Sequence, residues 1–357
     1  MLMNVIDLAD QIIDQAIKAK ISDIHLESSV NVLRIRFRLD GKLYLERELN
    51  KDKAQPLMIR LKVMCGMDIA DMRHPQDGQL KYKFEDRYID LRLATIPTVH
   101  GEKMVIRILD QASGILSVDK LMLPRAISKK LLAEIRRSYG LFLVVGPTGS
   151  GKTTTLYALL QHINSLEKNI ITIEDPIEYQ LENINQIQVN SKAGITFATG
   201  LRAILRQDPD VILVGEIRDL ETAEIALRAA LTGHLVLGTL HTRDALEAIV
   251  RLQDMGIPSF RISSALRVVL AQRLIPIYCT ACQGAGCLLC QNTGYKGRRA
   301  IFEYLELTPK IQETINKTVG YNQLQEIARL ECYQPLVLNS RELLEKKITS
   351  REALGEV

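Results

Sequence analysis

Hydrophobic positions change their spacing along the chain, and each spacing predicts a different kind of element. Residues 4–20 carry apolar side chains at helical intervals, which predicts an amphipathic helix. From residue 33 to residue 46, apolar and polar residues alternate on both sides of Asp40-Gly41, which predicts a β-hairpin with one buried face. A second helix is expected over 53–66, and further strands near 79–84, 87–94 and 103–109. Residues 1–110 are therefore predicted to form a small α+β domain.

The polar face of the predicted hairpin carries three arginines, Arg34, Arg36 and Arg38. Such a row fits a nucleic-acid surface, a solvated strand face or a contact with another subunit. Proteins that bind single-stranded nucleic acid combine basic grooves with aromatic side chains on which bases stack, and this segment has no such platform. A solvated strand face or a subunit contact is therefore the favoured interpretation.

The second part of the chain has a different order of elements. Residues 111–122 are weakly periodic and are expected to link two domains. Beyond them, short apolar runs alternate with helical stretches, which is typical of a largely buried sheet in an α/β domain covering 123–357. The apolar runs lie at 141–145, 170–173, 211–214 and 235–240.

Charge and hydropathy narrow the possible functions. The formal net charge is +4, from 46 basic and 42 acidic side chains that are interspersed rather than grouped in blocks, so direct nucleic-acid binding is not expected. No apolar run reaches the roughly 18 residues that a membrane span needs. The first residues lack the basic and apolar regions of a secretory signal, which places the chain in the cytoplasm.

The clearest chemical motif follows the apolar run at 141–145. Residues 146–153 read GPTGSGKT, a phosphate-binding loop between a predicted strand and a predicted helix, so the chain is interpreted as an NTPase. Lys152 is expected to reach the β and γ phosphates, and the hydroxyl of Thr153 to bind Mg²⁺. The residues expected to hold the nucleotide are Gly146, Pro147, Thr148, Gly149, Ser150, Gly151, Lys152, Thr153 and Thr154, with Asp175 from a neighbouring strand.

Acidic and histidine side chains stand at the ends of the next apolar runs. Glu174 and Asp175 follow one run and can hold Mg²⁺ or orient a water. Glu216 follows another and is expected to polarise the attacking water or to support the metal shell. His234 and His241 bracket a third run. His241 is the candidate sensor of the γ-phosphate, whereas His234 fits either a catalytic or a structural role.

Four of the six cysteines form two C-x-x-C pairs separated by a glycine-containing loop. Disulfides are disfavoured in a reducing compartment, and four thiolates at this spacing can enclose Zn²⁺ with no open coordination position. A structural zinc site is therefore predicted within 275–298; its loss should unfold that subdomain and leave the phosphate-loop chemistry intact. Cys65 and Cys332 are expected to be packed. The zinc ligands are Cys279, Cys282, Cys287 and Cys290.

Four segments together resemble the Walker A motif, Asp box, Walker B motif and His box of the type II secretion and type IV pilus ATPase family. They are GPTGSGKT, ITIEDPIEY, LRQDPDVILVGEIRD and TGHLVLGTLHTRDA, in that order. The segments at 22–25, 73–78 and 91–107 look like the second amino-terminal domain of that family. The resemblance extends over roughly residues 5 to 345.

The resemblance implies a RecA-like P-loop NTPase core preceded by a small α+β, PAS-like domain and followed by helices at 305–357. It also implies an ATPase that forms a homohexameric ring on the cytoplasmic face of the cell membrane. In such systems the ring acts on a polytopic platform protein of the inner membrane, and through it on pilin-like subunits. The arginines that match the family's nucleotide-contacting arginines are Arg92 and Arg107, although arginine on a strand face is commonly a solvent-facing residue.

Within the family, the tetracysteine segment is typical of secretion and pilus-assembly members and is generally absent from retraction motors. The expected lack of a long first amino-terminal domain makes the chain most like the competence pseudopilus ATPase of Gram-positive bacteria, which serves DNA uptake. A general type II protein secretion ATPase and another type IV pilus motor remain alternatives. A DNA translocase is opposed by the near-neutral charge. A scaffold that does not hydrolyse ATP is opposed by the presence of Lys152, Thr153, Glu174 and Glu216.

Overall fold

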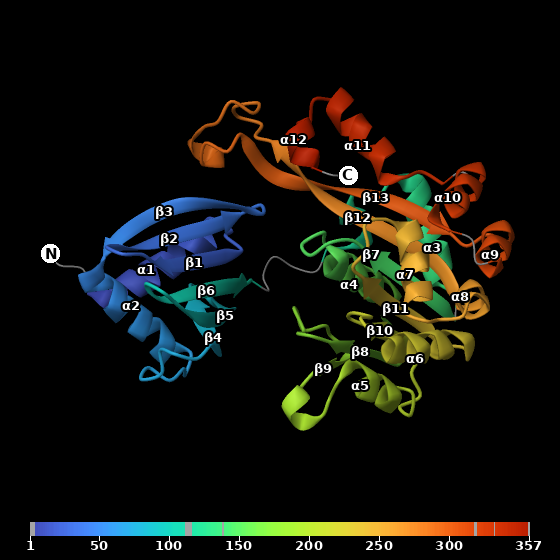
Figure 1. The fold of residues 1–357 in the computed structure, drawn as a ribbon, viewed down its shortest axis with the longest axis horizontal. Coiled ribbons are helices and arrows are strands. Elements are labelled where there is room, and N and C mark those ends of the chain that lie inside the picture. The colour runs from blue at the N-terminus through green and yellow to red at the C-terminus, as the bar shows by residue number, and fades with distance from the viewer. Residues whose placement is uncertain (1–3, 111–115, 138, 318–319, 332, 356–357) are drawn as a thin grey trace. The chain divides into compact units, whose positions relative to one another are not determined.

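The computed structural model describes residues 4–110, 116–137, 139–317, 320–331 and 333–355. The chain divides into two compact units, one of residues 1–114 with 286–293 and the other of residues 115–285 with 294–357 (Figure 1). The second unit is an α/β structure and the first is a smaller α+β structure with its own sheet, in agreement with the expected fold class. Part of the expected linker, residues 111–115, lies outside the described residues.

The first unit is a six-stranded antiparallel sheet with two helices on one face (Figure 1). The strands lie in the order β3-β2-β1-β6-β5-β4. The helices are α1 (Val5–Lys18) and α2 (Lys51–Met64), and their apolar sides form one buried cluster with the inner face of the sheet. The strands are β1 (Asp23–Ser28), β2 (Val32–Leu39), β3 (Lys42–Asn50), β4 (Gln76–Phe84), β5 (Arg87–Thr98) and β6 (Gly101–Leu109).

Strand β1 has no counterpart among the predicted elements, although it lies at the centre of this sheet between β2 and β6. Its first four residues, Asp23 to Leu26, are all buried, and two of them are polar. The strand does alternate, but it is short and holds only two apolar residues, Ile24 and Leu26, so its pattern is much weaker than that of β2.

The three arginines of β2 lie on the face of the sheet opposite the helices. Each forms an ion pair with an acid of its own hairpin or of β1, so the row is partly neutralised within the unit, as expected for a strand face. The pairs are Arg34–Glu48 at 2.9 Å, Arg36–Glu27 at 2.7 Å and Arg38–Asp23 at 3.7 Å.

The second unit is a seven-stranded sheet in the order β13-β12-β7-β11-β10-β8-β9. All neighbouring strands are parallel except β13, which is antiparallel to β12 at the edge. The strands are β7 (Gly140–Val145), β8 (Ile170–Glu174), β9 (Asn185–Gln188), β10 (Val211–Val214), β11 (Leu235–Leu240), β12 (Leu266–Tyr278) and β13 (Tyr295–Glu306). The four predicted apolar runs are thus the central strands, whereas β9, β12 and β13 were not predicted.

Helices cover both faces of this sheet, which explains why its strands read as uninterrupted apolar runs. Along β7, Leu141, Leu143 and Val145 join one buried cluster, and Phe142 and Val144 join the other. The helices are α3 (Arg125–Ile135), α4 (Lys152–Ile163), α5 (Phe197–Ile204), α6 (Leu220–Leu231), α7 (Ala245–Asp254), α8 (Ser259–Ala265), α9 (Pro309–Asn316), α10 (Tyr321–Leu330), α11 (Leu336–Glu345) and α12 (Arg351–Leu354). Helices α3 and α4 pack on one face, and α5 to α8 with α9 to α11 on the other.

No helix within the described parts of the chain is both long enough and apolar enough to cross a membrane.

Candidate functional site

The candidate site lies at the carboxyl edge of the parallel strands in the second unit. The phosphate loop follows β7, Glu174 ends β8, Glu216 follows β10 and His241 follows β11. Open α/β sheets bind their ligands at this edge because parallel strands all end there. The loops after β10 and β11 are short, and each ends at an aspartate, Asp219 or Asp244, whose side chain caps the next helix.

The glycines of the phosphate loop are required by its protein neighbours as well as by a phosphate. Gly146 has φ 148°, and a Cβ there would lie 2.4 Å from the carbonyl oxygen of Gln272. Gly151 has φ 88° and caps α4; a Cβ there would lie 2.7 Å from Nε2 of Gln272. The loop therefore packs directly on β12. Helix α4 points its free N-terminal amide groups into the loop, which is a favourable position for an anion.

Lys152 begins α4 and is only 9% exposed. Its Nζ donates to the carbonyl oxygens of Gly146 at 2.8 Å and Pro147 at 3.0 Å, so the ammonium is held inside the loop that would surround the phosphates. The pKa of Lys152 is lowered to about 8, mainly by burial and also by the charge of Arg273, while the carboxylate of Glu216 opposes both. A bound triphosphate would replace the carbonyl contacts with charge-assisted ones.

Glu216 lies close to one guanidinium group and one imidazole ring. Its Oε2 is 2.7 Å from the guanidinium of Arg218, and its Oε1 is 3.5 Å from Nε2 of His241. Burial raises the pKa of Glu216, but the hydrogen bond from Arg218 and the charges of His241 and Lys152 outweigh burial, so the pKa lies below its usual value. Glu216 is therefore ionised at neutral pH and available as an acceptor of a proton or of a water hydrogen bond.

His241 has a pKa below the ordinary value of histidine because burial, Lys152 and Arg218 all disfavour its charged form, whereas Glu216 favours it. The imidazole is therefore neutral at neutral pH. A neutral ring has one donor and one acceptor nitrogen, so it can report a γ-phosphate or a water by a hydrogen bond rather than by charge.

Glu174 differs from Glu216 in its surroundings. It is 3% exposed, and its carboxylate accepts hydrogen bonds from the side chains of Tyr157, Thr172 at 2.6 Å and Gln186 at 3.2 Å. A Cβ on Gly215 would lie 3.1 Å from the Cα of Glu174, so the glycine before Glu216 lets the ends of β8 and β10 approach closely. The following Asp175 is exposed and faces the charge of Arg218.

The structure does not bring His234 to this edge. His234 precedes β11, and its carbonyl oxygen accepts from the amide of Gly140 at the start of β7. Its Nδ1 is 3.0 Å from the carbonyl oxygen of Ala229, the geometry of a side chain that caps the end of α6. The six residues of β11 lie between it and His241, which places the two histidines about 23 Å apart at the usual rise per residue. His234 lies at the opposite end of β11 and contacts the end of α6, and both observations favour the structural role over the catalytic one.

Arg92 and Arg107 belong to the first unit, on the neighbouring strands β5 and β6. They are directly paired in the strand register. The Nε of Arg107 donates to Oδ1 of Asp23 at 3.0 Å. Asp23 also lies 3.7 Å from Nε of Arg38, so one buried carboxylate balances two guanidinium groups.

The four predicted zinc ligands come together on the loop between β12 and β13. Their sulfur atoms all lie within 4.8 Å of one another. Sγ of Cys287 and Sγ of Cys290 are 3.8 Å apart, which matches the edge of about 3.8 Å in a tetrahedron with Zn–S bonds of about 2.3 Å. The same distance is far too long for a disulfide. The donor set therefore fits Zn²⁺. Of the remaining cysteines, Cys65 is half-buried, and Cys332 lies outside the described residues.

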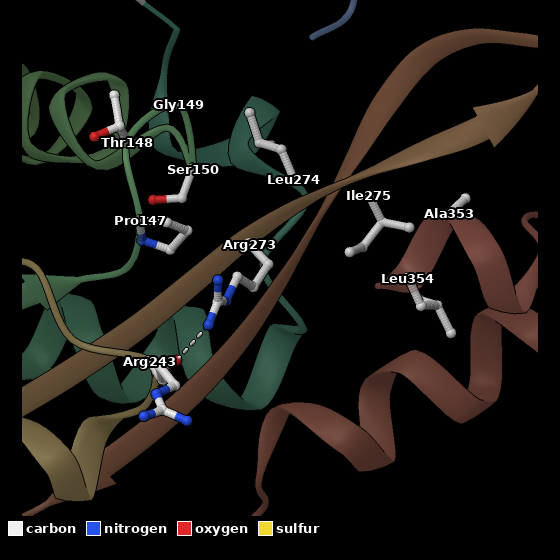
Figure 2. Close-up of a pocket in the computed structure, with 10 residues that line it drawn as sticks. All are labelled: Pro147, Thr148, Gly149, Ser150, Arg243, Arg273, Leu274, Ile275, Ala353 and Leu354. Atoms are coloured by element: carbon white, nitrogen blue, oxygen red, sulfur yellow. Dashed lines mark hydrogen bonds between the residues drawn. The ribbon is translucent and has the colours of Figure 1, made fainter. Parts of the chain in front are cut away.

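Several residues of the site were not identified from the sequence. Arg218 pairs with Glu216, and Gln272 is buried beside the phosphate loop, where its Oε1 accepts from Thr155 at 2.7 Å. Arg243 and Arg273 line a cavity of about 510 Å³ next to the loop (Figure 2). Gln272 and Arg273 lie on the unpredicted strand β12, so no sequence signal connected them with the loop.

Comparison with known proteins shows the family of the chain. The chain is 43% identical to the "Putative type II secretion system protein E" of Escherichia coli K12, over 99% of this chain and 76% of that protein. It is also 43% identical to the "Type II secretion system protein E" of Aeromonas hydrophila, over 99% and 75%. The crystal structure of the pilus retraction motor PilT with bound ADP is 32% identical and superposes with a TM-score of 0.71 over 97% of this chain and 95% of that one. Residues 2–356 match the "Type II/IV secretion system protein" family. The chain therefore belongs to this family of secretion ATPases and is itself an ATPase.

Proposed function

We propose that this chain hydrolyses MgATP at the carboxyl edge of its second unit and uses the energy as a ring-shaped motor that assembles a pilus or pseudopilus. The observation that carries the proposal is the meeting of Lys152, Glu216 and His241 at the end of the parallel strands. Family membership supports the mechanical output, because related proteins are named for type II secretion and pilus movement.

The residues divide the chemistry among them. Lys152 and the amides that begin α4 hold the β and γ phosphates, and Thr153 supplies its hydroxyl to Mg²⁺. Mg²⁺, when bound, would neutralise part of the charge that develops on the γ-phosphoryl group. Glu216, ionised and fixed by Arg218, accepts a hydrogen bond from the attacking water. His241 detects the γ-phosphate. Glu174, with its oxygens already occupied, positions the end of β8.

Arg92 and Arg107 are proposed to add positive charge at the transferring phosphoryl group. A guanidinium in that role contributes about 10³–10⁵ in rate. Arg107 must then exchange Asp23 for the nucleotide. Arg107→Ala should lower turnover while leaving nucleotide affinity nearly unchanged, and unaltered turnover in that variant would remove Arg107 from the mechanism.

The ATPase assignment is tested with two variants that separate binding from chemistry. Lys152→Ala should lose most nucleotide binding and all measurable turnover. Glu216→Gln should keep the nucleotide bound and release no phosphate. Turnover at the wild-type rate in Lys152→Ala would refute the phosphate-loop assignment, and unchanged phosphate release from Glu216→Gln would exclude Glu216 as the water-activating group.

The partners are proposed from family membership. They are further copies of the same chain in a hexamer, a polytopic platform protein at the cytoplasmic face of the membrane and, through it, pilin-like subunits. Within this class of motors, we propose that the chain serves competence, that is, DNA uptake, and this proposal is supported by the sequence resemblance. The printed names of the relatives favour general type II secretion as the alternative. Deleting the gene separates the two, because loss of DNA uptake with normal protein export indicates competence, and the reverse indicates secretion.

A further inference from the structure

The cavity beside the phosphate loop is built from four separate parts of the second unit (Figure 2). The phosphate loop forms one side. Arg243 comes from the loop after β11, and a three-residue stretch of β12 forms the adjoining wall. The fourth part is the short helix α12, about 200 positions after the phosphate loop in the sequence. The lining residues are Pro147, Thr148, Gly149, Ser150, Arg243, Arg273, Leu274, Ile275, Ala353 and Leu354.

The lining changes in character from one end to the other. The loop end presents backbone and small polar groups suited to phosphates. Arg273 follows, and its guanidinium is fixed by a 3.1 Å hydrogen bond to the carbonyl oxygen of Arg243. Arg273 also depresses the pKa of Lys152, which places its charge near the phosphate position. Farther along, the side chains are apolar and come from Leu274, Ile275 and α12. A volume of about 510 Å³ falls in the usual range for a site that holds a small organic ligand.

The segment that contains α12 is fastened to strands β12 and β13 by three hydrogen bonds. The amide of Tyr278 donates to the carbonyl oxygen of Ile348 at 2.8 Å. The hydroxyl of Thr349 donates to the carbonyl oxygen of Pro276 at 2.6 Å, and the hydroxyl of Tyr295 donates to Oγ of Ser350 at 2.8 Å. Three consecutive residues are thus tied to β12 and β13.

The helix itself is set by the last of these residues. Oγ of Ser350 accepts from the amide of Ala353 at 3.1 Å and so caps α12. The side chain of Leu354 then packs against the apolar core of the unit while remaining half-buried at the cavity. A segment near the end of the chain therefore has a defined position at the site, rather than a loose one.

From this arrangement we propose that the carboxy-terminal segment, residues 348–354, is the wall of the nucleotide site that contacts the base, with Leu354 as its main contact. The inference rests on the proposed nucleotide-binding function and extends it to the non-phosphate part of the ligand. A purine is flat and largely apolar on its faces, so apolar side chains and a guanidinium plane are complementary to it. The base adds affinity there, while the phosphate loop holds the charge.

The segment also connects the site to the four-cysteine loop. Tyr278 and Tyr295, which anchor it, stack with ring centroids 5.4 Å apart and stand at the base of that loop. The amide of the adjacent Cys279 donates to the carbonyl oxygen of Gly294 at 2.9 Å and closes the loop at the same level. Loosening the cysteine loop should therefore disturb the contact with the base, although the phosphate contacts themselves lie elsewhere.

The test compares two ligands that differ in the base. Binding of a nonhydrolysable ATP analogue and of inorganic tripolyphosphate, each with Mg²⁺, is measured by calorimetry on the full chain. Leu354→Ala should weaken the analogue about tenfold, which corresponds to the loss of roughly 1.4 kcal/mol. Tripolyphosphate has no base and should bind as it does to the wild type. Leu354→Met keeps the apolar contact and serves as the matched control, with near wild-type affinity for both ligands.

A second variant tests the anchor rather than the contact. Ser350→Ala removes both the cap of α12 and the partner of Tyr295, and it should also weaken the analogue selectively. Wild-type affinity for the analogue in both Leu354→Ala and Ser350→Ala would overturn the proposal, as would an equal loss for both ligands, which indicates general damage to the site. Failure of the wild type to bind either ligand would instead refute nucleotide binding altogether.

Discussion

At the scale of single residues, Lys152 combines burial with a position inside the phosphate loop. Its pKa of about 8 in the free protein lies close enough to neutrality to matter for binding. The triphosphate needs the charged ammonium, and its presence raises the pKa of Lys152, so binding should be accompanied by proton uptake once the pH exceeds about 8.

We predict that the affinity for ATP falls as the pH rises through this value. At pH 9 about one tenth of the free protein would carry a charged Lys152, so the apparent Kd should be about tenfold larger than at pH 7. Calorimetry of the nonhydrolysable analogue in buffers of different ionisation enthalpy measures both the affinity and the protons taken up. Lys152→Arg is the control, because arginine stays charged throughout this range and its pH profile should be flat. A flat profile in the wild type would contradict the prediction.

The sequence identified the residues whose role depends on local spacing. The phosphate loop, Glu216 and His241 each follow an apolar run, and parallel strands bring such positions to one edge. Gln272, Arg273 and Leu354 are far from that motif in sequence and carry no motif of their own. They reach the site only through the placement of β12 beside β7 and of α12 beside β12, which local patterns do not contain.

At the scale of elements, Glu303 on β13 links two helices to the sheet. It is 1% exposed; its Oε1 accepts from the amide of Ala245 at 2.6 Å, and its Oε2 accepts from the amide of Leu336 at 3.0 Å. These amides begin α7 and α11, so the carboxyl group accepts at two helix N-termini at once; burial raises its pKa, and the hydrogen bonds from the two amides oppose that shift. Helix α7 directly follows the loop that carries His241 and Arg243.

Glu303→Gln should therefore destabilise the second unit. A carboxamide has only one acceptor oxygen, so one amide would face an NH₂ group and lose its partner, at a cost of about 1–3 kcal/mol. Urea unfolding followed by far-ultraviolet circular dichroism measures the change. Glu306→Gln, on the same strand but 41% exposed and paired at 3.6 Å with Lys130, should cost less than about 1 kcal/mol. Equal stability of the two variants would show that the buried contacts of Glu303 contribute little.

The four-cysteine loop gives a second prediction at this scale. The purified chain should contain about one zinc per molecule, as a closed site with four cysteines requires. Cys287→Ser should lose most of the metal, because the remaining three thiolates no longer complete the tetrahedron. Metal analysis after dialysis measures both, with Cys65→Ser as the control, since Cys65 lies outside the cluster and should not affect the zinc content. A folded wild type without metal would contradict the assignment.

Secondary structure was predictable where the pattern of apolar residues was long enough, either as an alternation along β2 or as the uninterrupted apolar runs of the central strands. Strand β2 has an alternation of eight residues and was found, whereas β1 alternates with only two apolar residues and was not. Strands β12 and β13 were missed for a different reason. They form one long hairpin whose connection is the cysteine loop at 279–290, so their pairing joins residues up to 38 positions apart, which no local pattern contains. Strand β13 is an antiparallel edge strand on an otherwise parallel sheet. Strand direction depends on topology, which local sequence patterns do not contain.

At the scale of the whole molecule, the sequence resemblance predicted the family and the fold class, and both are confirmed by the comparisons. The four motifs were enough to predict the fold class, because each follows a strand and all four strands belong to the same sheet. The number of copies in the assembly could not be predicted in this way, because subunit contacts are made by surfaces that carry no sequence motif. A net charge of +4 neither drives copies of the chain together nor keeps them apart.

We predict that nucleotide favours the hexamer. If arginines of the first unit contribute to the nucleotide site, then bound nucleotide stabilises the arrangement of units that a ring requires, and mass action shifts the chain towards assembly. Analytical ultracentrifugation with the nonhydrolysable ATP analogue should give a species of six times the 40.2 kDa of one chain, with smaller species in its absence. Lys152→Ala should remain small under both conditions, because it does not hold the phosphates. If instead this variant assembled as readily as the wild type, ring formation would be independent of the site, and the motor would have to couple hydrolysis to movement within a permanent hexamer.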